Sequence, residues 1–99
     1  MKDKIILDVL LPATQRSYEF RVPFDLTVDQ AAQLMARILA TREPASYEAD
    51  GNADLMLRRV GPDGRSAGMS DGEMLNPNET FRALAERNVL VDGSPVAIV

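Results

Sequence analysis

Two stretches near the start of the chain decide the fold: residues 4–11, which read KIILDVLL, and residues 17–23, which read SYEFRVP. Apolar side chains recur at every second position in both stretches, which is the pattern of strands that bury one face. These positions are Ile5, Leu7, Val9 and Leu11 in the first stretch and Tyr18, Phe20 and Val22 in the second. Residues 12–16 interrupt the pattern, so we predict a two-stranded hairpin.

A helix is predicted soon after the hairpin, beginning at residue 28. Thr27 and Gln30 have the spacing of a capping box, in which each side chain bonds the backbone amide of the other residue. The apolar positions that follow lie within one helical stripe, and they are Val28, Ala31, Ala32, Met35, Ile38 and Leu39. A residue before proline avoids helical geometry, so Glu43, which precedes Pro44, should end the helix.

The second half of the chain alternates short strand patterns with turns. Residues 45–53 predict a loop, residues 55–60 a strand, residues 61–72 a long turn, residues 74–75 a short strand, residues 80–85 one helical turn and residues 96–99 a closing strand. The one long helix must bury its stripe against a mixed sheet of four to five strands, which defines an α+β domain of two layers. A right-handed crossover leaves the middle of the sheet for the last strand, parallel to the first.

Composition narrows the chemistry that this chain can perform. With 99 residues, of which 45% are hydrophobic, we expect a single domain spanning residues 1–99. The absence of cysteine, histidine and tryptophan removes thiolate and imidazole catalysis and the usual zinc or copper ligands. A net charge of −4 argues against nucleic acid as a partner. We therefore expect a non-enzymatic protein without cofactor or metal.

The first residues predict no membrane insertion. Asp8 interrupts the apolar run after Ile5, Ile6 and Leu7, which leaves neither a signal peptide nor a membrane span. A cytoplasmic location is therefore expected, and a chain without cysteine fits a reducing compartment.

The order of these patterns resembles the ubiquitin-like β-grasp family. The resemblance rests on the alternating hairpin, residues 25–28 that open the helix, residues 55–57, and residues 75–84 before the last turn and strand. Within that family the chain looks most like the bacterial YukD/EsaB-type ubiquitin-like proteins of type VII (WXG-type) secretion. The resemblance implies a non-covalent adaptor accessory to such a secretion system. The chain departs from the family pattern in its longer segments 45–53 and 85–91.

Strand alternation also predicts an apolar patch on the outer face of the sheet. Successive strand residues face opposite ways, so Ile6 and Leu10 point outward if their neighbours point inward, as do Met56 and Ala97. In the β-grasp arrangement these strands adjoin, and the four residues form one patch rimmed by Asp8 and Arg58. Such patches are commonly partner sites. The predicted interaction site is therefore Ile6, Leu10, Met56, Arg58 and Ala97.

This patch leaves several interpretations open. It would hold another protein or a second copy of the chain, as a homodimer. Alternatively, residues 45–53 or 85–91 fold over it and make it part of the interior. Residues such as Asp63 and Asp71 precede glycines in turn sequences, and we interpret them as turn residues and not as calcium ligands.

A second hypothesis is a protein modifier or sulfur carrier of the ubiquitin, MoaD or ThiS kind. Such proteins present a flexible Gly-Gly tail, because only glycine lets the backbone approach an activating enzyme so closely. Residues 95–99 read PVAIV and predict a strand instead, which disfavours this hypothesis. A third hypothesis, a small enzyme using carboxylates and arginine, needs a cleft that a two-layer domain of this size rarely offers.

Overall fold

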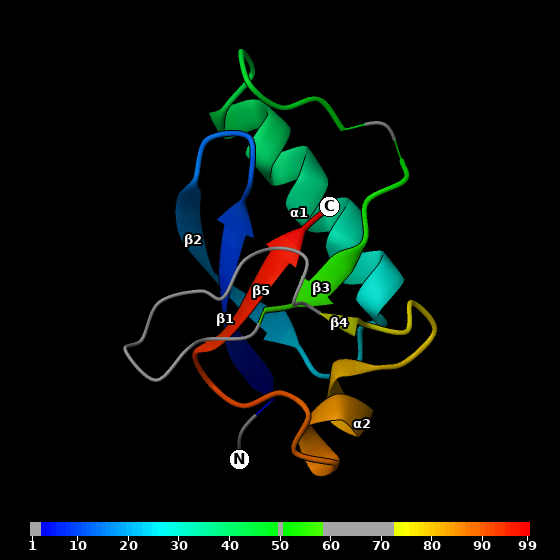
Figure 1. Ribbon diagram of the computed structural model, residues 1–99. Helices are drawn as coiled ribbons and strands as arrows, with labels where there is room; N and C mark the ends of the chain where they lie inside the picture. The colour runs from blue at the N-terminus through cyan, green and yellow to red at the C-terminus, as the bar shows by residue number, and fades with distance from the viewer. Residues whose placement is uncertain (1–2, 50, 59–72) are drawn as a thin grey trace.

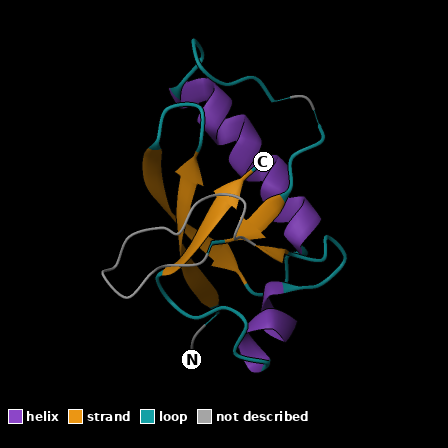
Figure 2. Ribbon diagram, viewed as in Figure 1, coloured by secondary structure: helices purple, strands orange, loops and turns teal. Residues whose placement is uncertain are grey.

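The computed structural model describes residues 3–49, 51–58 and 73–99 (Figure 1). Its elements, in chain order, are β1 (Lys4–Leu11), β2 (Arg16–Pro23), α1 (Val28–Arg42), β3 (Leu55–Leu57), β4 (Glu73–Met74), α2 (Phe81–Glu86) and β5 (Ser94–Ile98). The strands form one sheet in the order β2-β1-β5-β3-β4, and α1 lies across one of its faces (Figure 2). The predicted mixed sheet with one main helix on one face is confirmed.

The strand pairing follows the predicted arrangement. β1 and β2 form the antiparallel hairpin, with Leu7 opposite Phe20. β5 then lies between β1 and β3, parallel to β1 with Val96 beside Val9, and antiparallel to β3 with Val96 beside Leu57. The closing strand is thus in the middle of the sheet, and it begins at Ser94, two residues earlier than the sequence pattern indicated.

The main helix begins as its sequence predicts. The Gln30 N–H donates to Thr27 Oγ1 at 3.2 Å, and the Thr27 N–H donates to Gln30 Oε1 at 3.0 Å, which completes the capping box. α1 ends at Arg42, and the N–H of Glu43 bonds the carbonyl of Leu39 as the cap. Both ends of α1 are therefore encoded locally.

One residue of the predicted helical stripe is misplaced. Ile38 is 44% exposed, whereas Ala36 is buried in its place. At 100° per residue, Ile38 lies about 90° from the centre of the buried stripe and Ala36 about 70° from it. Leu34 lies still farther round the same flank and is 43% exposed. The flank of α1 beside the buried stripe therefore carries two large apolar side chains, Leu34 and Ile38, at the surface.

The core lies between α1 and the sheet. Its largest fully buried side chains come from every layer of the domain: Phe81, Ile5, Leu7, Leu11, Leu39, Leu55, Leu84, Leu90, Ile98, Val9, Val28 and Val96. Phe81 belongs to α2, whose N-cap Thr80 accepts a hydrogen bond from the Ala83 N–H at 3.2 Å. α2 is held near the start of α1, because the Val28 N–H donates to the Glu79 carbonyl at 2.8 Å. The short helix thereby closes one end of the core.

The short strands differ in extent from their sequence patterns. β3 covers Leu55–Leu57, and residues 59–60 of the predicted strand lie outside the described residues, as does the predicted turn at 61–72. β4 consists of Glu73 and Met74, while Leu75 leaves the strand and is buried in the core. Over the described residues, no helix combines the length and apolar character needed to cross a membrane.

A side-chain link joins the far end of α1 to β2. The Tyr18 hydroxyl donates to Glu43 Oε1 at 2.5 Å, and Arg16 Nη1 lies 3.2 Å from the same oxygen. The hydrogen bond to Glu43, aided by the charge of that carboxylate, raises the pKa of Tyr18 above its ordinary value of 10.0. Folding therefore favours the protonated phenol.

This link predicts a pH dependence at the alkaline end. Because the pKa of Tyr18 is raised in the folded state, its contribution to stability is full below about pH 10 and is lost as pH rises through the folded pKa. Tyr47 is the second of the two tyrosines, so Tyr47→Phe leaves Tyr18 as the one phenol that titrates. In this variant, ultraviolet titration should give a Tyr18 pKa in the folded chain that is higher than in the unfolded chain. Adding Glu43→Ala should bring it back toward the ordinary value, and an unchanged midpoint would contradict the proposed cause.

Candidate protein-interaction surface

The predicted outward residues are brought together in one row across the sheet. Leu10 of β1 pairs with Ala97 of β5, and Ala97 pairs with Met56 of β3. Met56 pairs in turn with Met74 of β4. We call these four residues, Leu10, Ala97, Met56 and Met74, the outer apolar row. Three predicted site residues are thus neighbours on the face away from α1, as the alternation of strand side chains requires.

Most of the outer apolar row is nevertheless buried. The exposed fractions are 8% for Leu10, 7% for Met56 and 0% for Ala97, and these three residues form a hydrophobic cluster separate from the main core. Ala97 lies between Leu10 and Met56 in the row. The sequence predicted an exposed patch at these positions, and the structure places a second, small core there instead.

Ile6 does not join this cluster. It is partly exposed, and its outward neighbour along β1 toward Leu10 is Asp8. Asp8 was expected at the rim of the patch, but it lies between the two apolar residues on the same face of the same strand. A carboxylate at that position keeps Ile6 apart from Leu10. Ile6 instead lines a shallow surface depression with Asp3, Arg21 and Asp92 among its neighbours.

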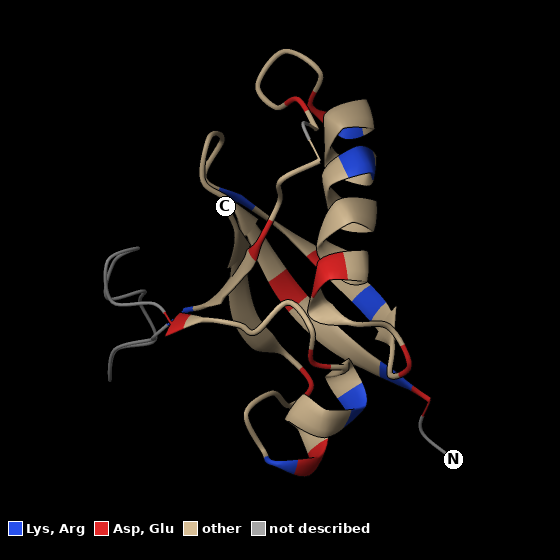
Figure 3. Cartoon of the chain, turned by 90° about the vertical axis from the view of Figure 1, so that its right-hand side faces the viewer, with Lys and Arg blue, Asp and Glu red and all other residues tan. Residues whose placement is uncertain are grey.

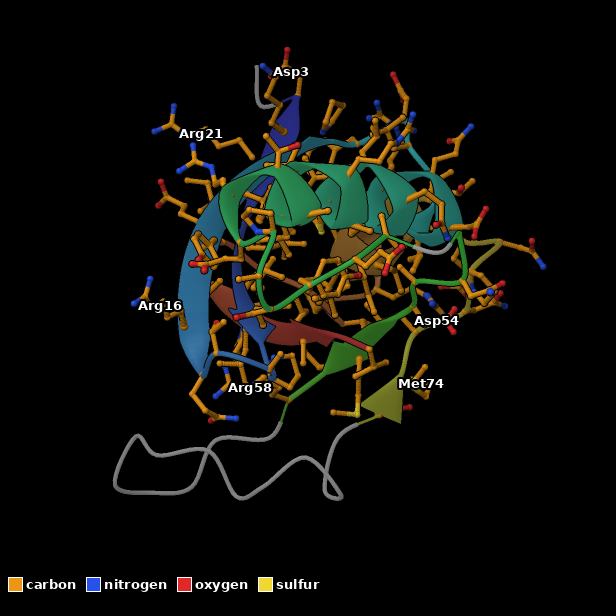
Figure 4. The ribbon with its side chains drawn as sticks, turned by 90° about the horizontal axis from the view of Figure 1, so that it is seen from above. Asp3, Arg16, Arg21, Asp54, Arg58 and Met74 are labelled. Carbon is orange, nitrogen blue, oxygen red and sulfur yellow. The ribbon has the colours of Figure 1, made fainter. Side chains whose placement is uncertain are left out.

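Arg58 occupies the next row of the same face. Its N–H donates to the Pro95 carbonyl at 2.9 Å, and Pro95 pairs on its other side with Asp8. The central strand therefore separates Arg58 from Asp8. The Arg58 side chain is half-buried, and its Nε has no hydrogen-bond partner among the described residues. Figure 4 shows Arg58 and Met74 on the side of the sheet away from α1.

Met74 is a residue of this surface that the sequence reasoning missed. It is 53% exposed, so it is the solvent-accessible end of the outer apolar row. Its place in a strand was predicted, because residues 74–75 were expected to form a short strand. Its facing depends on pairing with Met56, and the register of a two-residue strand cannot be read from alternation.

The sequence matches no protein-family model, and no curated protein matches it. Solved structures match by shape. The ubiquitin-like domain of the Mycobacterium tuberculosis type VII secretion system protein ECCD1 is similar at a TM-score of 0.62 and 13% identity, over 100% of this chain and 99% of that chain. The EccD5 ubiquitin-like domain from Mycobacterium xenopi is similar at 0.60 and 17% identity, over 99% and 94%. The fold is the ubiquitin-like β-grasp.

A further similarity is to part of a longer protein. A chain of the MycP5-free ESX-5 inner membrane complex matches at a TM-score of 0.62 and 13% identity, over 99% of this chain but only 21% of that chain. In that complex a β-grasp domain of this shape is therefore one portion of a larger polypeptide. At these identities the likeness establishes the fold alone.

The two segments expected as possible cover for the outer face pack elsewhere in this β-grasp domain. Tyr47, Ala49 and Ala53 of the loop after α1 contact the main core. Val89 and Leu90 of the segment after α2 contact the same core. The described residues of both segments therefore pack on the helix side of the sheet, and none of them belongs to the Leu10, Met56 and Ala97 cluster.

Residues 94–99 are held in the centre of the β-grasp sheet. Beyond the last residue of β5, the Val99 N–H donates to the Asp54 carbonyl at 2.9 Å, and the Asp54 N–H donates to the Val99 carbonyl at 3.0 Å. These residues could enter an activating enzyme only if the central strand left the sheet. The modifier hypothesis gains no support from this pairing of residues 94–99.

The described ranges contain no group of three or more carboxylates placed to hold a metal ion.

Burial along the outer apolar row predicts unequal effects on stability. Met56→Ala should lower the free energy of unfolding by about 2 kcal/mol or more, because truncating a buried methionine removes contacts and leaves a cavity. Met74→Ala, in the same row, should change it by less than about 0.5 kcal/mol, because its side chain is half in solvent. Urea unfolding of both variants measures the difference, and equal effects would contradict the burial.

Proposed function

We propose that this chain is a non-enzymatic β-grasp interaction module that binds non-covalently to a component of a bacterial type VII secretion system. The observation that carries the proposal is the outer apolar row, which crosses four strands and ends in the exposed Met74. A β-grasp sheet face needs no apolar side chains toward solvent for its own stability. Met74 at 53% exposure is therefore available to a partner.

Two further observations support a binding role. The chain has no cysteine or histidine, so it cannot use a thiolate nucleophile or an imidazole general base. Its shape is similar to ubiquitin-like domains of ECCD1 and EccD5 and to part of a chain in an inner membrane complex. These proteins supply the secretion context of the proposal, and a cytoplasmic location follows from the same hypothesis.

The geometry favours the β3–β4 side of the sheet as the docking region. Leu10, Met56 and Ala97 form a packed base that is already buried, so a partner gains little by contacting them directly. Met74 lies on the border strand β4, next to the buried Met56, where an apolar side chain of a partner could cover it. Interface energy commonly concentrates in a few such side chains backed by packed neighbours.

The test is co-purification with type VII membrane components encoded in the same genome, co-expressed with the tagged chain. The wild-type chain should retain the complex, and Met74→Asp should weaken retention about tenfold, as expected when one central apolar contact is lost. Val91→Asp is the matched control, because Val91 is also exposed, at 57%, but lies outside the row.

Three results would contradict the proposal. The first is that the wild-type chain brings down none of the co-expressed components, and the second is that both aspartate variants lose binding equally. The third is that Met74→Asp retains the complex as well as the wild type does. Circular dichroism of both variants checks that the fold is kept, as their exposure predicts.

A further inference from the structure

β2 has one open edge. Over the residues that the structure describes, it lies at the border of the sheet and pairs with β1 alone. Ile6 of β1 pairs with Arg21 of β2, but its backbone N–H and C=O point to the other side of β1, where β5 lies. The Ile6 N–H donates to Asp92 Oδ1 at 3.0 Å, and the Ile6 carbonyl accepts from the Gly93 N–H at 2.8 Å. In an antiparallel pair of strands, a residue whose N–H and C=O point away from the partner strand lies opposite a residue whose N–H and C=O also point away. Arg21 and, two residues earlier, Glu19 therefore aim their backbone groups at the open edge.

The same two residues carry opposite charges along that edge. Glu19 and Arg21 are both exposed, and in the part of the chain that the structure describes neither makes an ion pair. Glu19 of β2 lies directly opposite Asp8 of β1. Like charges directly opposite each other in a sheet are destabilising. Figure 4 shows the Arg21 side chain directed away from the body of the domain. A cation beside Glu19 and an anion beside Arg21 would both be stabilising.

An apolar groove runs beside the open edge on the helix side. Its volume is about 110 Å³, and it lies between β2 and α1 with Phe20 on one wall and Leu34 and Ile38 on the other. The two helix residues are the large apolar side chains left exposed on the flank of α1. An open strand edge next to exposed apolar surface is a site for pairing with another strand.

We propose that two copies of this chain pair through β2, antiparallel, about a two-fold axis at Phe20. The sheets then join into one, with both α1 helices on the same side. In this register each Glu19 lies opposite Arg21 of the second copy, and the two residues exchange backbone hydrogen bonds. The two Phe20 side chains meet at the axis, in the kind of pair where side chains approach most closely.

Neighbouring registers are disfavoured by charge. An axis at Glu19 places two carboxylates against each other, and an axis at Arg21 places two guanidinium groups against each other. The order Glu19, Phe20, Arg21 is therefore self-complementary about its central residue only. Pro23 has no N–H and limits the ladder to a few residues, so we expect a weak dimer that forms as concentration rises.

The occupant favoured here is a second copy because the edge is complementary to itself. An extended acidic peptide of another protein could use the same edge, and Arg42 beside the groove would favour it; the experiment distinguishes the two. Pairing through β2 uses the border opposite Met74. It therefore stands or falls independently of the docking surface proposed above.

A charge-swap cycle tests the register. Sedimentation velocity at rising concentration should show the wild-type dimer, and Glu19→Arg or Arg21→Glu alone should each raise its dissociation constant about tenfold, because both pairs in the dimer become like-charged. The double variant should return to within about threefold of the wild type, since the pairs are restored in reverse. Glu48→Arg, on an exposed loop position, is the control and should change little.

A single introduced cysteine gives a second readout. The chain has no cysteine, so Phe20→Cys reports only contact across the proposed axis. Directly opposed residues of such a pair have Cα atoms about 4.5 Å apart, within disulfide range, so oxidation should give a linked dimer. Glu19→Cys should link far more slowly with itself, because its partner is Arg21.

The proposal is overturned if the wild-type chain stays monomeric at all concentrations, if the double charge swap fails to restore association, or if Glu19→Cys links as fast as Phe20→Cys. Binding of an acidic peptide by a chain that remains monomeric would assign the edge to that other occupant. Melting curves show whether Phe20→Cys has kept the fold. If it has not, the charge-swap cycle decides alone.

Discussion

The pairing of β5 between β1 and β3 is the constraint on which the rest of the molecule depends. It joins the N-terminal hairpin to the pair of short strands β3 and β4, and over the described residues no other strand connects these two parts of the sheet. Val96 and Ile98 supply the middle of the core on one face, and Ala97 supplies the middle of the outer apolar row on the other. A shift of β5 by one residue would exchange these faces, placing alanine in the core and large side chains outside.

Much of this architecture could be predicted because the signals are local. The Thr27 and Gln30 pair marks the start of α1 through hydrogen bonds between residues three apart, and Pro44 limits its end. Alternation in β1 and β2 defines which side chains enter the core, and the two strands are close in sequence. The absence of cysteine and histidine removes thiolate and imidazole chemistry without reference to any contact.

The remainder could not be predicted because it depends on contacts between distant segments. Alternation correctly sends Leu10, Met56 and Ala97 outward, but it does not tell whether an outward side chain meets water. Ile38 lies at the margin of the helical stripe, where a small change in how α1 sits on the sheet decides between burial and exposure. The role of Met74 follows from its register with Met56 and not from its own neighbours. Surface properties are thus less well encoded locally than strand and helix positions.

The central position of residues 94–98 also has a consequence for biosynthesis. The pairing of Leu7 with Ser94 joins segments separated by nearly the whole described chain, and contacts this distant slow folding. On a ribosome, the hairpin and α1 emerge long before the strand that completes their sheet, so the inner edge of β1 stays unpaired meanwhile. Until synthesis reaches those residues, the nascent chain exposes a strand edge that other polypeptides could occupy, and a holding chaperone would protect it during that interval.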